Sequence, residues 1–257
     1  MEGWYGNLNL MIFFNFAVFV LGLCVGSFLN VLIYRLPKNL GFVKGRSFCP
    51  KCKHKLTWFD NIPLLSFLIL KGRCRCCGKT ISWKYPIVEL LTGAVFLLSY
   101  LSNLSCLSYL LFAGLIVVFF IDLEHQIIPD EIVIPFSLFF LIYFLVVNPN
   151  LLITNYLIAG FFSFLFLYFI YLITKGKGMG FGDVKLAFLM GLVLGWPKII
   201  VAFYLAFLTG AIIGIILILL KKSKLKQKIA FGPFLCLGTI IAYLWGEQII
   251  KIFFKYL

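Results

Sequence analysis

Residues 110–122 read "LLFAGLIVVFFID", twelve uncharged residues followed by an aspartate. A run of this kind is typical of a helix in the hydrocarbon core of a bilayer. Comparable runs recur along the whole chain, which is 63% hydrophobic and only 12% charged over 257 residues. Soluble domains carry about twice that share of charged residues. The sequence therefore predicts an all-α polytopic membrane protein.

Eight segments are predicted to span the membrane, of which the sixth is the shortest. They are residues 9–34, 86–103, 105–122, 131–147, 151–173, 184–196, 198–220 and 231–253. A polar insert, residues 35–84, separates the first span from the second. We expect three parts: a first transmembrane helix (1–34), the insert (35–84) and a transmembrane bundle (85–257).

The basic residues predict how the spans are oriented. Twelve of the 23 Lys and Arg residues lie between Arg35 and Lys84, five lie in residues 221–228, and Lys175 and Lys177 precede the sixth span. With eight spans, these three regions fall on one side, and positively charged loops stay in the cytoplasm. Both termini are then expected outside. This bias, with attraction to anionic membrane lipid, accounts for the net charge of +14 and gives no indication of nucleic-acid binding.

Two aspartates stand out among the nine acidic residues. Asp122 ends an apolar helix, where the helix dipole disfavours a carboxylate, and ionisable residues at membrane depth are often functional. Asp183 lies in "GMGFGDVK" (178–185). It could simply cap the sixth span, but Gly180 and Gly182 flank Phe181, and such a stretch can adopt positive φ and let a peptide substrate lie against it. Asp130 is expected to cap the fourth span.

The predicted topology brings both aspartates to the cytoplasmic end of their spans. Two carboxylates at one depth can share a proton, so that one activates water as a general base while the other protonates a carbonyl as a general acid. No histidine cluster accompanies them, so no catalytic metal is indicated. Two other classes remain open, a proton-coupled transporter and a membrane scaffold with structural acids. Peptide cleavage that depends on both aspartates would exclude the transporter and the scaffold.

The insert carries a candidate metal site. Residues 49–52 read "CPKC" and residues 74–77 read "CRCC", with 21 residues between the two pairs. Cys49, Cys52, Cys74 and Cys77 have the spacing of a structural zinc site with four thiolates. Disulfides are disfavoured in the cytoplasm, which leaves reduced or redox-active thiols as the alternative to zinc. Cys76 could replace Cys77, although the C-x2-C spacing favours Cys77.

Several motifs together resemble the type IV prepilin peptidases, a family of intramembrane aspartyl proteases. Besides "GMGFGDVK", they are "IDLEHQIIPD", "GSFLNVLIYRLP", "DNIPLLSF", "YPIVE" and "FGPFL". The resemblance implies that Asp122 and Asp183 are catalytic. It also implies an enzyme of the bacterial inner membrane whose active site faces the cytoplasm. Its substrates would be the prepilins or pseudopilins of type IV pili, type II secretion or competence systems.

The resemblance implies a second activity for the insert. Members of the family with four such cysteines also N-methylate the new N-terminus of the cleaved substrate, using S-adenosylmethionine. The candidate cofactor-binding residues are Asn61, Gly72, Arg73 and Glu89. No Gly-rich fingerprint of a soluble dinucleotide-type fold is present, so a pocket would have to form between the insert and the spans. A peptidase without methyltransferase activity remains the alternative.

Overall fold

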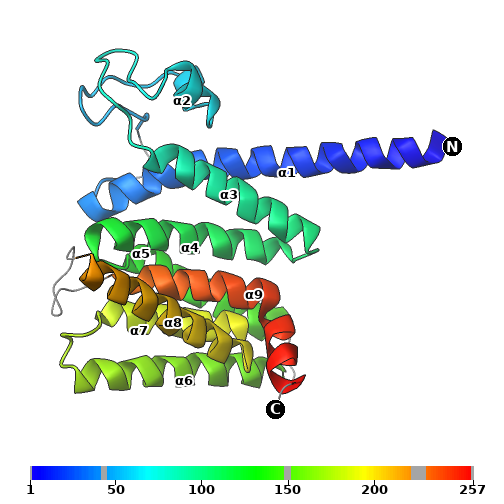
Figure 1. Ribbon diagram of the computed structural model, residues 1–257, viewed down its shortest axis with the longest axis vertical. Helices are drawn as coiled ribbons and strands as arrows, with labels where there is room; N and C mark the ends of the chain where they lie inside the picture. The colour runs from blue at the N-terminus through cyan, green and yellow to red at the C-terminus, as the bar shows by residue number, and fades with distance from the viewer. Residues whose placement is uncertain (1, 42–44, 148–151, 221–229, 256–257) are drawn as a thin grey trace. The chain divides into compact units, whose positions relative to one another are not determined.

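The computed structural model describes residues 2–41, 45–147, 152–220 and 230–255. These residues form helices joined by loops, with two isolated β-bridges in the insert (Figure 1). The long helices are α1 (Glu2–Arg35), α3 (Lys84–Leu101), α4 (Cys106–His125), α5 (Asp130–Val147), α6 (Leu152–Ile173), α7 (Phe181–Leu194), α8 (Lys198–Leu219) and α9 (Gly232–Lys255). The short ones are α2 (Leu65–Ile69) and the 3₁₀ helices η1 (Leu36–Lys38) and η2 (Trp58–Asn61).

The all-α membrane architecture predicted from the sequence is confirmed. A helix coincides with each of the eight predicted spans. Within the described residues, seven helices are long and apolar enough to cross a membrane, and α7 is the exception. Its 14 residues rise about 21 Å, less than the roughly 30 Å of a hydrocarbon core.

The chain forms two compact units, residues 1–117 and 118–257. In the first unit, α1 packs along α3. Gly22 and Gly93 make this approach close, because a Cβ on Gly22 would lie 2.8 Å from the Cα of Gly93. Phe96 of α3 meets Tyr109 of α4 edge to face, with ring centroids 5.0 Å apart. The insert lies between α1 and α3 in the sequence.

The second unit is built around α7. This helix packs against α5, α6 and α9, and α8 packs against α9. Ten of the fourteen α7 residues are buried, from Asp183 to Leu194. The short helix is therefore the core of its unit, and small residues allow its neighbours to come close. A Cβ on Gly160 of α6, for example, would lie 3.3 Å from the backbone of α7.

Helix α7 runs antiparallel to α6 over most of its length. At one end, the ring of Phe181 lies 5.6 Å from that of Tyr171. At the other end, the side chain of Asn155 donates to the Trp196 carbonyl (3.0 Å) and accepts from the Trp196 N–H (3.1 Å). The 14-residue helix, with the turn that follows it, thus brings the chain from the level where α6 ends back to the level where α6 begins.

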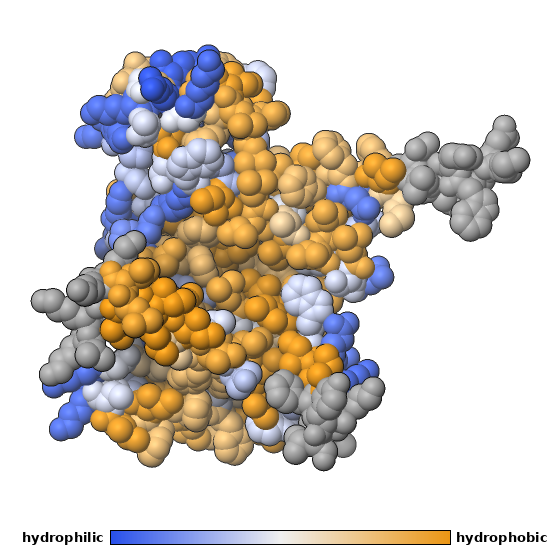
Figure 2. All heavy atoms as spheres, viewed as in Figure 1, coloured by the Kyte–Doolittle hydropathy of each residue, from blue (hydrophilic) through white to orange (hydrophobic). Residues whose placement is uncertain are grey.

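The surfaces of the long helices are apolar. Exposed side chains include Leu138, Ile142, Phe162 and Phe169, each more than half exposed. Figure 2 shows apolar residues over the long helices and polar residues gathered over the insert. This distribution is that of a multi-pass membrane protein. The lysine run 221–228 lies outside the described residues.

Candidate active site and metal centre

Asp122 lies in the last turn of α4 and is 4% exposed. Its Oδ2 accepts a hydrogen bond from the backbone N–H of Gly232, at the start of α9, with 2.9 Å between the atoms. A Cβ at position 232 would lie 2.6 Å from the same oxygen. Glycine is therefore needed at this position for α9 to approach the carboxylate.

Asp183 is the third residue of α7 and is 6% exposed. The N-cap of this helix is Gly180, not Asp183. The Asp183 carboxylate reaches back and accepts the Gly180 N–H at 3.0 Å, which satisfies one of the free donors at the helix start. Asp183 is therefore not the N-cap residue itself, but its carboxylate stabilises the helix end from the first turn.

A short segment, residues 126–130, follows α4, which carries Asp122, and contacts α7, which carries Asp183. The Gln126 N–H donates to the Asp122 carbonyl at 2.8 Å, which ends α4. In this segment, the side chain of Ile128 contacts Gly182 and Gly232. A Cβ on Gly182 would lie 2.8 Å from the Cβ of Ile128, and one on Gly232 would lie 3.2 Å from its Cδ1. Ile128 thus packs against Gly182, which precedes Asp183, and against Gly232, which binds Asp122.

The same segment ends in an ion pair. Both carboxylate oxygens of Asp130 lie 2.7 Å from the Nζ of Lys185, two residues after Asp183. Asp130 was expected to be an N-cap. In the structure it is the first residue of α5, and its side chain binds α7 instead of its own helix end. The pair therefore links the α5 terminus to the helix that carries Asp183.

The glycine-rich stretch differs from its expected conformation. Gly180 is extended, with φ −78° and ψ 153°, and neither it nor Gly182 has positive φ. Gly182 is instead required by its close contact with Ile128. Phe181, between the two glycines, is 42% exposed, and its ring contacts Tyr171 on one side. An apolar surface therefore lies directly before Asp183.

The four predicted metal-ligating cysteines come together in the insert. The sulfur atoms of Cys49, Cys52, Cys74 and Cys77 all lie within 4.8 Å of one another. The Cys52 and Cys74 sulfurs are 4.0 Å apart, close to the roughly 3.8 Å expected for two thiolates with Zn–S bonds of about 2.3 Å in a tetrahedron. Cys76 is exposed and outside the cluster. The donor set and its spacing fit a zinc ion.

The thiols of the cluster do not ionise independently. Backbone N–H groups of Cys77 and Cys76 lower the pKa of Cys74 to about 7. For Cys52, a backbone hydrogen bond involving His54 acts to lower the pKa, but burial and the neighbouring thiols outweigh it and raise the value to about 12. Cys74 therefore ionises more readily than Cys52, and a bound cation would favour the thiolate form of both.

Each cysteine pair sits in a small knuckle, and the two knuckles have the same hydrogen bonds at an offset of 25 residues. The first knuckle is residues 47–56 and the second is residues 72–81. In the first, the Cys49 N–H donates to the His54 carbonyl and the Lys53 N–H donates to the Cys49 carbonyl. In the second, the Cys74 N–H donates to the Lys79 carbonyl and the Gly78 N–H donates to the Cys74 carbonyl. The β-bridges repeat as well, between positions 48 and 55 and between 73 and 80. The residue after each second cysteine has positive φ.

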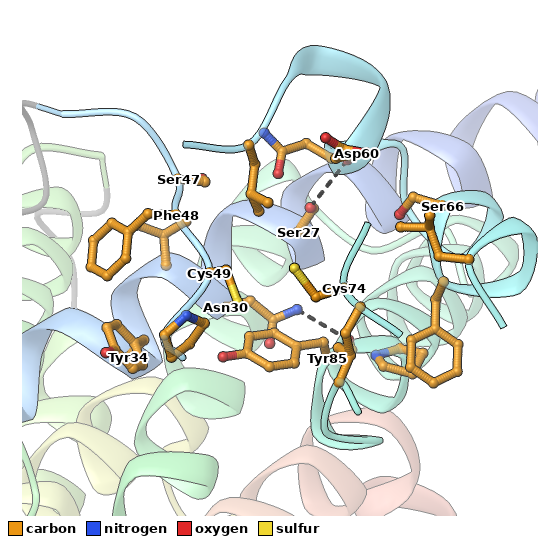
Figure 3. A pocket seen from close by; sticks show the side chains of 18 of the residues that line it. Ser27, Asn30, Tyr34, Ser47, Phe48, Cys49, Asp60, Ser66, Cys74 and Tyr85 are labelled. Carbon is orange, nitrogen blue, oxygen red and sulfur yellow. Dashed lines mark hydrogen bonds between the residues drawn. The ribbon is translucent and has the colours of Figure 1, made fainter. Parts of the chain in front are cut away.

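A cavity of about 180 Å³ lies between the insert and the adjoining ends of α1 and α3 (Figure 3). Of the four residues predicted to bind a cofactor, Asn61 and Glu89 line it. Gly72 and Arg73 do not, and belong instead to the second knuckle. Both metal-site knuckles contribute to the walls, through Cys49 and Cys74 among others. The cavity is smaller than the roughly 300 Å³ at which pockets begin to enclose a whole drug-sized ligand, so it fits one end of a cofactor.

The residues of these sites that the sequence analysis did not single out include Asn30 and Gly232. Asn30 of α1 lines the cavity, and Gly232 binds Asp122 from 110 positions further along the chain. Both lie inside motifs that were noted only as wholes, "GSFLNVLIYRLP" and "FGPFL". A polar amide within an apolar stretch of α1 was the available signal for Asn30.

Comparison with known proteins gives consistent matches over the chain. Residues 20–103 match the bacterial peptidase A24 N-terminal domain, and residues 109–215 match the type IV leader peptidase family. A prepilin leader peptidase/N-methyltransferase of Aeromonas salmonicida is 36% identical over 91% of both chains. The proteins of the same name from Bacillus subtilis (36% identical, 93% of this chain and 97% of that one) and Pseudomonas aeruginosa (33%, 95% and 94%) are similar to the same extent. No solved structure matches.

Proposed function

Because this chain belongs to the type IV leader peptidase family, we propose that it removes the leader peptide of prepilins or pseudopilins and then N-methylates the new N-terminus. The relatives described above carry both activities in their names. The observation that carries the peptidase proposal is a pair of buried carboxylates, Asp122 and Asp183, whose neighbours Gly232 and Gly182 both contact Ile128. A membrane protein has little structural reason to bury two acids together.

Cleavage in this proposal uses the two aspartates as an acid–base pair. The ionised carboxylate takes a proton from water, which attacks the scissile carbonyl, while the protonated carboxyl donates to the carbonyl oxygen. The Gly232 N–H holds Asp122 and the Gly180 N–H holds Asp183, so that each carboxylate has a fixed oxygen and a free one. Two carboxylates that share one low-dielectric site favour one shared proton over two ionised groups.

The substrate would lie against the stretch Gly180, Phe181 and Gly182. The extended backbone at Gly180 and the exposed ring of Phe181 suit an extended peptide with an apolar residue near the scissile bond. The apolar helix of the substrate would remain in lipid, beside the exposed apolar surfaces of the bundle. The basic leader would remain outside the hydrocarbon.

The active site would face the cytoplasm from the bacterial inner membrane. Lys175 and Lys177 lie in the loop that leads to Asp183, and positively charged loops favour the cytoplasmic side. Lys198, at the other end of α7, forms an ion pair with Glu247 (2.7 Å), which offsets its charge. The insert, with its many basic residues, would lie on the same side as the dyad.

Methylation would take place at the insert (residues 35–84), while the bundle (85–257) cleaves. S-adenosylmethionine supplies an electrophilic methyl group when it is bound. Asn61 and Glu89 would contact the cofactor or the methyl-accepting peptide in the cavity. Gly72 and Arg73 would act by forming the second knuckle. Zinc, held by the four cysteines, would have a structural role, since four thiolates leave no open ligand position for chemistry.

The test is the intact mass of a prepilin incubated with the purified protein, with and without S-adenosylmethionine. Loss of the leader and gain of one methyl group are expected. Asp122→Asn and Asp183→Asn should each abolish cleavage but methylate a pre-cleaved substrate. Glu131→Gln, an exposed acid in the first turn of α5, is the matched control and should cleave normally. Cleavage by the Asp183→Asn protein would refute the dyad.

A further inference from the structure

The floor of the insert cavity is formed by two helix faces. Helix α1 contributes Ser27, Asn30 and Tyr34, which are spaced three and four residues apart and so share one face. Helix α3 contributes Tyr85 and Glu89. Figure 3 shows Asn30 beside Tyr85, with Cys49 and Cys74 of the metal cluster nearby.

Asn30 has a buried hydrogen-bond acceptor without a partner. The residue is 5% exposed, and its Nδ2 donates to the Tyr85 carbonyl at 3.0 Å. That bond identifies which amide atom is the nitrogen, and the other atom, Oδ1, has no hydrogen-bond partner. Buried amide oxygens normally have a donor, so a donor is missing here.

Glu89 has a buried carboxylate without a cation. It is 8% exposed, and its Oε2 accepts the Leu64 N–H at 2.9 Å. In the part of the chain that the structure describes, no Lys, Arg or His pairs with it. The two arginines that line the cavity have other partners: Arg75 binds Asp60, and Arg35 donates to backbone carbonyls near Gly45. A buried carboxylate is costly unless a positive charge accompanies it.

We propose that Asn30 and Glu89 form a binding subsite for a protonated primary amine. An ammonium group has three donors and a positive charge, and it therefore supplies the hydrogen bond that Asn30 lacks together with the charge that Glu89 lacks. A hydroxyl would supply only the first, and a guanidinium needs more room. The cavity of about 180 Å³ holds an amine-bearing end of a larger molecule.

This inference rests on the proposed methyl transfer, which brings two such amines to the insert. One is the α-amino group of S-adenosylmethionine, and the other is the N-terminus of the cleaved substrate. The chemistry of the subsite is the same for both. Binding measurements on each ligand separately distinguish them and do not depend on catalysis.

The experiment uses the full-length protein loaded with zinc. Binding of S-adenosylmethionine is measured by calorimetry. Binding of a substrate-derived peptide labelled at its C-terminus is measured by fluorescence anisotropy, with its N-terminus free or acetylated. The variants are Asn30→Leu, which removes the acceptor, and Glu89→Gln, which removes the charge but keeps the oxygen that binds the Leu64 N–H.

Asn15→Leu is the matched control. Asn15 lies on the same helix, its Oδ1 also has no partner, and it does not line the cavity. We expect Asn30→Leu and Glu89→Gln to weaken the binding of one ligand about tenfold or more, which is the usual effect of losing a hydrogen bond to a charged group. Asn15→Leu should leave both affinities unchanged.

Each outcome decides the proposal. Weaker binding of S-adenosylmethionine alone assigns the subsite to the methyl donor. Weaker binding of the peptide with a free N-terminus, while the acetylated peptide binds weakly to every variant, assigns the subsite to the peptide that receives the methyl group. Unchanged affinities in Asn30→Leu and Glu89→Gln, an equal loss in Asn15→Leu, or no binding of either ligand by the wild type would overturn the subsite. A wild type that binds a ligand through these residues but transfers no methyl group would overturn the proposed function only.

Discussion

Gly232→Ala tests how closely cleavage depends on the position of Asp122. The added Cβ would lie 2.6 Å from Asp122 Oδ2, and ordinary contact begins near 3.4 Å, so the carboxylate must retreat by about 0.8 Å. The same retreat stretches the 2.9 Å bond from the Gly232 N–H. A misplacement of about 1 Å at a catalytic group can cost roughly 10²-fold in rate. We therefore expect kcat for leader cleavage to fall about 10²-fold with KM nearly unchanged.

The assay is the rate of leader removal by purified protein in lipid vesicles, followed by mass. Methylation of a pre-cleaved peptide should continue at the wild-type rate, which also shows that Gly232→Ala folds. Gly210→Ala is the matched control, since its Cβ would lie 3.4 Å from Phe234, an ordinary contact. A Gly232→Ala protein that cleaves within twofold of the wild type would refute the idea that the Gly232 contact holds Asp122 in its catalytic position.

Three further outcomes are expected. Cys77→Ser should lower the zinc content measured by elemental analysis, whereas Cys76→Ser should retain one zinc per chain, because only Cys77 belongs to the cluster. Removing zinc with a strong chelator should stop methylation but spare cleavage, because the cysteines lie in residues 1–117 and both aspartates in 118–257; parallel loss of the two activities would contradict this. Lys185→Met should reduce cleavage severalfold while the melting temperature changes little, since an exposed ion pair contributes about 0–1 kcal/mol. Exchanging the charges of Lys185 and Asp130 should restore the lost cleavage, and failure of that rescue would argue against a positioning role.

The membrane helices were predictable because apolar composition and helix length are local properties. The same reasoning could not reveal that α7 is the buried centre of its unit, since a short apolar run is equally compatible with an exposed helix. Burial of α7 depends on small residues in its neighbours, such as Gly160 in α6. Such pairings are properties of two segments together.

The site was predictable where one segment carries the signal. The spacing of the four cysteines indicates the metal cluster, and the charge of the two aspartates in apolar surroundings marks them as candidates. Ile128 and Gly232 carry no such signal, because one is an ordinary apolar residue and the other is one of 22 glycines. The role of Gly232 follows from its contact with Asp122, 110 positions away, and that of Ile128 from its contacts with Gly182 and Gly232. For Asp130, the local sequence favoured an N-cap, but its side chain pairs with Lys185, 55 positions away.

The repeated knuckles of the insert would give a bound metal a particular mechanical role. Each knuckle is closed by its own backbone hydrogen bonds. A zinc ion would join the two, with Cys49 and Cys52 on one side and Cys74 and Cys77 on the other. Both knuckles also wall the cavity that contains Asn30 and Glu89. A zinc ion bound there would therefore act as a spacer that sets the width of the cavity, and it would govern ligand affinity without touching the ligand.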